Sequence, residues 1–435
     1  MHRHNAWAVL RMWKAPGLVL GATGFTLWLA GGCPTPRPPV DGSAPPFNNT
    51  TDPTNRGAHY IGSTACSACH PDIAALTRVH GHTFALNRVQ GEPPVYPTQA
   101  TRAGVPNPPD AKTWNDVSYV ISGYTHGAYF VDSSGYVMTN GDIGADSQWN
   151  LTFPPNGTVA GFAPYLPNQT TPLPYVYDCF RCHTTAPQPQ DPNDPRSQDG
   201  RPGIQGTWAE AGVQCEACHG PGSNHIPTPA AREMFVDSTP ATCARCHTFG
   251  DDPNVIVAAD GYVNPYTQYA ELRASGGHSS FNCTVCHDPH VSTAYNAGVR
   301  NACTTCHAGM NLAFHEGIVF QRGDYREPLA CPSCHMPFTG RSNSNAGPAE
   351  LDNSGGRMGD VRGHVFRIST TNYVYTQMFS ADGTSVLKDP LGLAAVTTDF
   401  VCLRCHNGTG NAFVIAQRGA PVIANQMHQH AASQP

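Results

Sequence analysis

The chain has 435 residues, of which only 13% are charged, while Gly (43) and Pro (40) are frequent. So many residues that break helices and strands exclude a fold built from long regular elements. The formal net charge of −6 argues against nucleic acid as a partner.

The N-terminus has the pattern of an export signal. Three basic residues in MHRHNAWAVLRMWK precede an apolar stretch, Ala15 to Ala30, that is short for a membrane span. The stretch ends in LWLAGGC, which resembles the lipobox of bacterial lipoproteins, with Ala30 where Leu is usual. We expect residues 1–32 to be a signal peptide and Cys33 to carry a lipid. The alternative is an ordinary cleavage site beside an unmodified thiol.

The segment after Cys33 is rich in Pro and has almost no apolar content up to residue 58. This composition predicts an extended tether over residues 33–58. Loss of the three basic residues of the signal peptide would lower the formal net charge from −6 to −9.

Sixteen of the 17 cysteines belong to eight Cys-x-x-Cys-His motifs. Zinc ribbons and disulfides also use paired cysteines, but neither requires a histidine directly after the second one. The five-residue pattern is the attachment signature of c-type haem. We therefore predict eight covalently bound haems, which agrees with export because c-type haem is attached outside the bacterial cytoplasm.

The motif spacing suits one helical turn, which places both cysteines on one face and the histidine beneath the ring. The predicted thioether cysteines are Cys66, Cys69, Cys179, Cys182, Cys215, Cys218, Cys243, Cys246, Cys283, Cys286, Cys303, Cys306, Cys331, Cys334, Cys402 and Cys405. The predicted axial histidines are His70, His183, His219, His247, His287, His307, His335 and His406.

Eleven further histidines remain after the signal peptide, so eight irons could each take a second imidazole. In HSSFNCTVCHDPH we expect His287 to serve its own motif and the two flanking histidines to reach other irons. The predicted second ligands are His82, His225, His278, His290, His315, His364, His428 and His430, with His59, His80 and His126 in reserve. Met310 and Met336 are interpreted as gap-filling residues.

The region between the first two motifs predicts a small β sheet. VSYVISGYTHGAYFVDSSGYVMTN has aromatic and β-branched residues on both sides of a turn at 132–135, over residues 117–139. We expect this sheet to cover one haem. The segment NYVYTQMF could hold a second short strand pair.

Motif spacing divides the mature chain into three parts. Residues 59–178 hold the first haem and the β region, residues 179–340 hold six haems, and residues 341–435 hold the eighth. The predicted fold is mostly irregular coil with short helices around stacked haems, and its core is largely porphyrin.

Several segments resemble bacterial multihaem c-type cytochromes, including cytochrome c-554-like proteins. The likeness is carried by WAEAGVQCEACHGPGSNH, by GSTACSACHPDI with the later GHTFALN, and by FNCTVCHDPH. TWNDVSYVISGY followed by YDCFRCHTT is similar to outer-surface cytochromes of metal-reducing bacteria, some of which polymerise into conducting filaments. The resemblance spans roughly residues 59–340. It implies electron transfer by stacked bis-histidine haems at the cell surface or beyond. His126 stands where a ligand is not expected in such relatives, which ranks it low among the reserve histidines.

These observations favour an electron conduit whose partners are other redox proteins or an extracellular acceptor, held at the outer membrane by Cys33. A variant is a filament in which His59 ligates a haem of the next subunit. The alternative is an octahaem enzyme acting on nitrite, hydroxylamine or tetrathionate, which requires one iron with an open or unusual site. All eight motifs end in His, and the mature chain has only Lys112 and Lys388, so no open site is marked. A periplasmic electron store is a third interpretation.

Overall fold

The computed structural model describes residues 51–406, apart from residues 53–54, 194, 230–233, 235–238, 313–314, 343–350, 352–354, 370 and 372. The predictions on Cys33, His428 and His430 lie outside the described residues. The division of the chain into parts remains a prediction.

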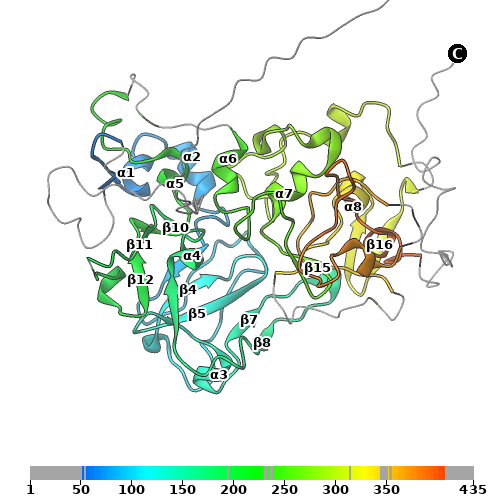
Figure 1. Ribbon diagram of the computed structural model, residues 1–435. Helices are drawn as coiled ribbons and strands as arrows, with labels where there is room; N and C mark the ends of the chain where they lie inside the picture. The colour runs from blue at the N-terminus through cyan, green and yellow to red at the C-terminus, as the bar shows by residue number, and fades with distance from the viewer. Residues whose placement is uncertain are drawn as a thin grey trace, which may run out of the picture. The chain divides into compact units, whose positions relative to one another are not determined.

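Helices are short throughout the described residues, as the frequency of Gly and Pro predicts (Figure 1). The α-helices are α1 (Ser63–Ser67), α2 (Pro71–Thr77), α3 (Asn140–Ile143), α4 (Tyr177–Phe180), α5 (Cys215–His219), α6 (Pro240–Ala244), α7 (Gln268–Arg273), α8 (Cys331–His335) and α9 (Thr398–Val401). The 3₁₀ helices are η1 (Trp114–Asp116), η2 (Pro154–Asn156), η3 (Gln198–Gly200), η5 (Gly276–His278), η6 (Cys283–Val285), η7 (Cys303–Thr305) and η9 (Tyr375–Met378). Within the described part of the chain, none of the helices has the length and apolar character needed to span a membrane.

A nine-stranded sheet occupies the region between the first and third motifs. Its strands are β3 (Leu86–Arg88), β4 (Val117–Ser122), β5 (Gly127–Asp132), β6 (Tyr136–Val137), β7 (Gln148–Asn150), β8 (Gly161–Ala163), β9 (Leu173–Val176), β11 (Gln188–Pro189) and β12 (Ile204–Thr207). The order is β11-β12-β9-β6-β5-β4-β3, and β7 pairs with both β5 and β8. Neighbouring strands are antiparallel except β9 and β12, which are parallel.

The predicted β region is confirmed, but the sheet is larger than expected. The turn at Asp132–Gly135 joins β5 to β6, where Val131 pairs with Val137. The longer pairing is β4 with β5, and its connection runs through Gly123, whose φ of 90° suits glycine. The sequence did not reveal β7–β12 because those strands are two to four residues long, too short for a visible alternation pattern.

Four further strand pairs are two-stranded and antiparallel. They are β1 (Thr51–Asp52) with β2 (Ala58–His59), β10 (Thr184–Thr185) with β13 (Glu210–Ala211), β14 (Ala258–Ala259) with β15 (Tyr262–Val263), and β16 (Val319–Arg322) with β17 (Tyr325–Pro328). The first pair lies at the end of the expected tether, residues 33–58, and extends one residue beyond it to His59.

The prediction of a strand pair at NYVYTQMF is wrong, because residues Tyr375–Met378 of this segment form the 3₁₀ helix η9. The Gln377 side chain accepts a hydrogen bond from the backbone N–H of Val374 at 2.9 Å, which closes a helical turn. Only a single bridge, Phe379 with Val386, retains strand pairing there.

The sheet contributes a side-chain core that composition did not predict. Strand β4 is buried on both faces: Tyr119 and Ile121 pack in one apolar cluster, and Val120 packs in another. Trp208 and Phe180 extend the first cluster towards the second motif, with ring centroids 5.2 Å apart. Side chains therefore form a packed wall beside the second motif.

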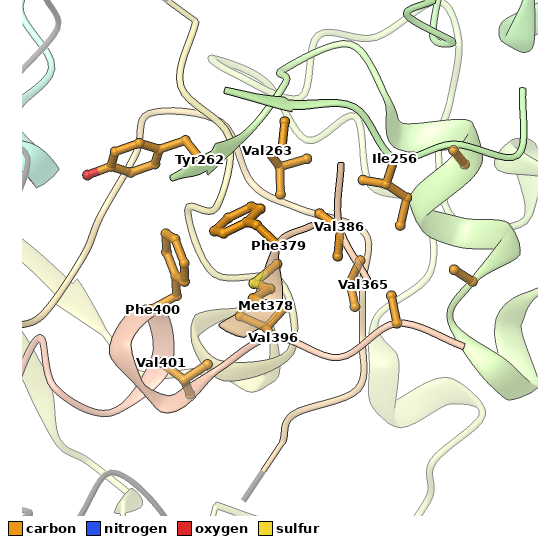
Figure 2. Close-up of a cluster of buried hydrophobic side chains, with 14 residues drawn as sticks. Ile256, Tyr262, Val263, Val365, Met378, Phe379, Val386, Val396, Phe400 and Val401 are labelled. Atoms are coloured by element: carbon orange, nitrogen blue, oxygen red, sulfur yellow. The ribbon is translucent and has the colours of Figure 1, made fainter. Parts of the chain in front are cut away.

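A second core joins the middle of the chain to its C-terminal part (Figure 2). Ile256, Tyr262 and Val263 come from residues 256–263, and they face side chains from residues 365–401. Phe400 on α9 meets the Tyr262 ring edge to face at 5.8 Å. This contact brings the eighth motif against residues that precede the fifth.

A buried ion cluster ties the β16–β17 hairpin to the last two motifs. Glu327 accepts hydrogen bonds from Arg404 at 3.2 Å, from Arg362 at 3.0 Å and from the Ser333 hydroxyl at 2.7 Å. The Arg404 side chain is only 2% exposed. Burial by itself would raise the pKa of Glu327, but the two guanidinium groups and the hydroxyl outweigh it and hold the pKa below its ordinary value.

We predict that Glu327→Gln lowers the free energy of unfolding by about 3 kcal/mol, because Arg404 would keep a buried charge without its partner. Since the pKa of Glu327 is lowered, its stabilisation is present above the ordinary pKa and is lost as pH falls through the folded value. Denaturant titration of the holoprotein at pH 7 measures the change. Arg326→Ala, on the exposed side of the same strand, is the control and should have little effect.

Candidate haem sites

Each motif lies in or beside a short helical turn, as the spacing predicts. We number the motifs in chain order as site 1 to site 8. In five of them the histidine N–H donates to the carbonyl of the first cysteine at 2.9–3.0 Å, namely in sites 1, 4, 5, 6 and 8. This bond sets the histidine one turn below the first cysteine, which is the arrangement needed for two thioethers and one axial imidazole.

Six of the eight predicted second ligands lie opposite a motif histidine. The ring centroids of these pairs are 5.8–6.3 Å apart. The pairs are His70 with His225, His247 with His82, His219 with His290, His307 with His278, His287 with His364, and His406 with His315. They belong to sites 1, 4, 3, 6, 5 and 8.

This spacing fits one iron between two imidazoles. A metal–nitrogen bond of about 2.0 Å, with roughly 1.1 Å from nitrogen to ring centre on each side, places two opposed ring centres about 6.2 Å apart. The angle between the ring planes ranges from 6° to 79°, as expected if each ring rotates freely about the metal–nitrogen axis. The residues present therefore fit a haem iron with two histidine ligands.

The HSSFNCTVCHDPH segment illustrates how the pairs connect motifs. His287 pairs with His364, while His278 pairs with His307 of site 6 and His290 pairs with His219 of site 3. One thirteen-residue stretch thus reaches three sites. Sites that share such a short stretch must lie close to one another.

Hydrogen bonds orient several motif histidines for ligation through Nε2. The Nδ1 atom of His183 lies 2.9 Å from the Ala85 carbonyl, and that of His335 lies 2.8 Å from the Phe366 carbonyl. The Nδ1 atom of His247 lies 3.1 Å from Oε1 of Gln268. When Nδ1–H donates to such an oxygen, Nε2 keeps the lone pair that binds a metal.

Burial favours the neutral form of two of the paired imidazoles, His82 and His364, and the neutral form is the one that ligates metal. Burial, followed by the nearby His80 and His247, lowers the pKa of His82 to about 3. Burial, followed by His287 and His247, lowers the pKa of His364 to about 3.

Cysteines of different motifs contact one another, which the sequence could not show. Thiol pairs within hydrogen-bond reach join site 1 to 3, site 2 to 4, site 4 to 5 and site 6 to 7. They are Cys66 with Cys215, Cys182 with Cys246, Cys243 with Cys283, and Cys303 with Cys331. Three further cysteine pairs are close enough to influence each other electrostatically: Cys218 with Cys243, Cys286 with Cys306, and Cys334 with Cys402, which belong to sites 3 and 4, 5 and 6, and 7 and 8.

Two glutamates that sequence analysis missed fix site 1 against site 3. Glu216, inside the third motif, accepts backbone hydrogen bonds from Gly62 at 2.8 Å and Gly222 at 2.7 Å. Glu210 accepts from the Ser63 hydroxyl at 2.9 Å, at the start of α1. The variable positions of a Cys-x-x-Cys-His motif carry no pattern, so no sequence signal marks Glu216.

The reserve histidines occupy three different environments. His59 is exposed, and its Nδ1 lies 3.1 Å from the Thr51 hydroxyl. His80 lies beside His82 with ring centroids 4.5 Å apart, and its Nδ1 accepts the His82 backbone N–H. His126 lies 3.8 Å from the Asp360 carboxylate. Among the described residues, no imidazole lies opposite His183 of site 2.

Comparisons with known proteins give similar structures but no sequence family. No protein-family model matches the chain, and no curated protein matches its sequence. The solved structures similar to it are multihaem cytochromes.

The outer cell wall cytochrome OcwA is 17% identical, with a TM-score of 0.45, 75% of this chain and 82% of that chain covered. The octaheme sulfite reductase MccA of Wolinella succinogenes is 16% identical, with a TM-score of 0.48, 79% of this chain and 64% of that chain covered. The S-layer undecaheme cytochrome of Carboxydothermus ferrireducens is 18% identical, with a TM-score of 0.38, 72% of this chain and 52% of that chain covered. At these scores the likeness does not establish a shared fold, and the site is argued from the chain's own residues.

We predict that His225→Ala converts one haem in eight from low spin to high spin, because site 1 would lose its second imidazole. Electron paramagnetic resonance of the oxidised protein measures the change. The matched control is His59→Ala, whose exposed ring is held by Thr51 and should leave the spectrum unchanged. An unchanged spectrum in His225→Ala would show that this residue is not an axial ligand.

Proposed function

We propose that the chain is an octahaem c-type cytochrome that carries electrons from haem to haem, outside the cytoplasm and at the cell surface. The observation that carries this proposal is the set of six imidazole pairs at 5.8–6.3 Å. Haem iron supplies reversible one-electron chemistry when it is bound.

The imidazole pairs decide what kind of chemistry these six sites support. If both histidines of a pair ligate the iron, they would leave no position for a substrate on the metal, while electron exchange with neighbouring haems would stay possible. A methionine ligand would raise the potential, and paired histidines keep it lower. The residues of these six sites therefore favour electron transfer over bond-making chemistry.

The cysteine contacts support a continuous route across the protein. They connect the sites in the order 1, 3, 4, 5, 6, 7 and 8, with site 2 joined to site 4. Haems attached to these cysteines would therefore lie next to one another along the chain of sites.

The experiment that tests the proposal combines haem counting with electrode measurements. We expect mass spectrometry of the denatured protein to show eight covalently bound haems, one for each motif. We expect a protein film on an electrode to exchange electrons with all of them, and a soluble ferric complex to reoxidise the reduced protein. Fewer than eight haems, or haems that the electrode cannot reduce, would contradict the proposal.

Lipid attachment at Cys33 would hold the electron route at the outer membrane. We predict that Cys33→Ser moves the protein from the membrane fraction to the soluble fraction of an expressing bacterium, because the acylated residue is lost. Cell fractionation with radiolabelled palmitate measures both location and modification. Wild-type protein that takes up no label would disprove the lipid anchor and leave the electron-transfer proposal intact.

A further inference from the structure

One short stretch, residues 364–366, contacts histidines of three haem sites, and we call it the junction segment. His364 lies opposite the motif histidine of site 5, with ring centroids 6.0 Å apart. The Phe366 ring stacks on His278 of site 6, with centroids 4.5 Å apart and planes 28° apart. The Phe366 carbonyl lies 2.8 Å from Nδ1 of His335 in site 7. Three successive sites thus meet at one segment.

The junction segment is anchored on two sides. Val365 is only 1% exposed and packs in the second core (Figure 2). On the other side, the buried Glu271 carboxylate accepts the His364 backbone N–H at 2.6 Å. The Ser275 hydroxyl accepts the Phe366 backbone N–H at 3.2 Å. A buried carboxylate is costly without its donors, so these contacts hold the backbone of the segment in one position.

Two aromatic rings determine how the His278 imidazole is oriented. Phe366 covers its face, and Phe281 meets it edge to face at 5.5 Å. Arg273 donates to the Phe281 carbonyl at 3.2 Å, which holds the turn that carries both rings. The plane of His278 lies 47° from that of His307, the imidazole opposite. Because a metal–nitrogen bond leaves its imidazole free to turn, this packing decides the angle.

We propose that Phe366 is a positioning residue of site 6, whose ring fixes the plane of the His278 imidazole through stacking. A packed neighbour that locks the side chain of a ligand keeps its geometry constant, which suits electron transfer because little rearrangement then accompanies it. The inference deepens the proposed function and rests on the haem ligation that the function requires.

The consequence is a spectroscopic signature confined to one haem. The angle between two axial imidazole planes sets the g values of a low-spin ferric haem. Replacing the Phe366 side chain removes the stacking on His278. It leaves the backbone carbonyl that orients His335 in place, so site 7 should keep its spectrum.

The test is electron paramagnetic resonance of the oxidised holoprotein. We expect Phe366→Leu to shift the g values of one low-spin haem in eight, and Phe366→Tyr, which keeps the ring, to restore the wild-type spectrum. The matched control is Phe162→Leu. Phe162 is half-buried like Phe366 and packs on Trp149 at 5.0 Å, so its loss should leave every g value unchanged.

Mass spectrometry of each denatured variant counts its haems, so that a shift is compared only between proteins with eight. Should Phe366→Leu retain fewer, Phe366→Met, which fills more of the same space, takes its place in the comparison. Three results would overturn the inference: a wild-type spectrum in the Leu or Met variant, the same shift in Phe162→Leu, or the same shift in Phe366→Tyr. Fewer than eight haems in the wild-type protein would instead contradict the proposed function.

Discussion

The opposition of two imidazoles from distant segments is the contact on which the remaining structure depends. His70 and His225, or His287 and His364, are brought together across long stretches of chain whose helices are too short to be stable alone. A metal shared by the two rings would close such loops, and ligands that meet only in the folded chain would make metal binding part of the folding free energy. Folding and haem attachment would then be one process.

Buried acidic side chains add hydrogen bonds that hold neighbouring motifs together. Glu216 accepts hydrogen bonds from the backbone N–H of Gly62, before the first motif, and of Gly222, after the third, while Glu327 holds Arg404 within the eighth motif. Each buried carboxylate depends on hydrogen-bond donors from neighbouring segments. It therefore stabilises only the arrangement of motifs that brings those donors together. These contacts fix the orientation of one motif against the next, which an axial ligand alone leaves free to rotate.

The sequence predicted features that depend on neighbouring residues in the chain, but not those that depend on packing between distant segments. The motif turns follow from spacing alone, and six histidines chosen by position, such as His82 and His290, lie opposite motif histidines. Their partners could not be assigned, because nothing in the sequence says which segments meet. The same limit hid the strands β7–β12 and the neighbouring cysteines of different motifs. The strand prediction at NYVYTQMF failed because the hydrogen bond from the Val374 backbone N–H to the Gln377 side chain favours a helical turn over a strand.

The sheet fixes the place of site 2 beside the other sites. Phe180, inside the second motif, is fully buried in the apolar cluster to which strand β4 contributes Tyr119 and Ile121. Site 2 meets site 4 where the Cys182 and Cys246 sulfurs each lie 3.9 Å from a backbone carbonyl of the other motif. A short motif turn has little stability of its own, so the packed side chains of the sheet supply the rigidity that holds this motif against its neighbour.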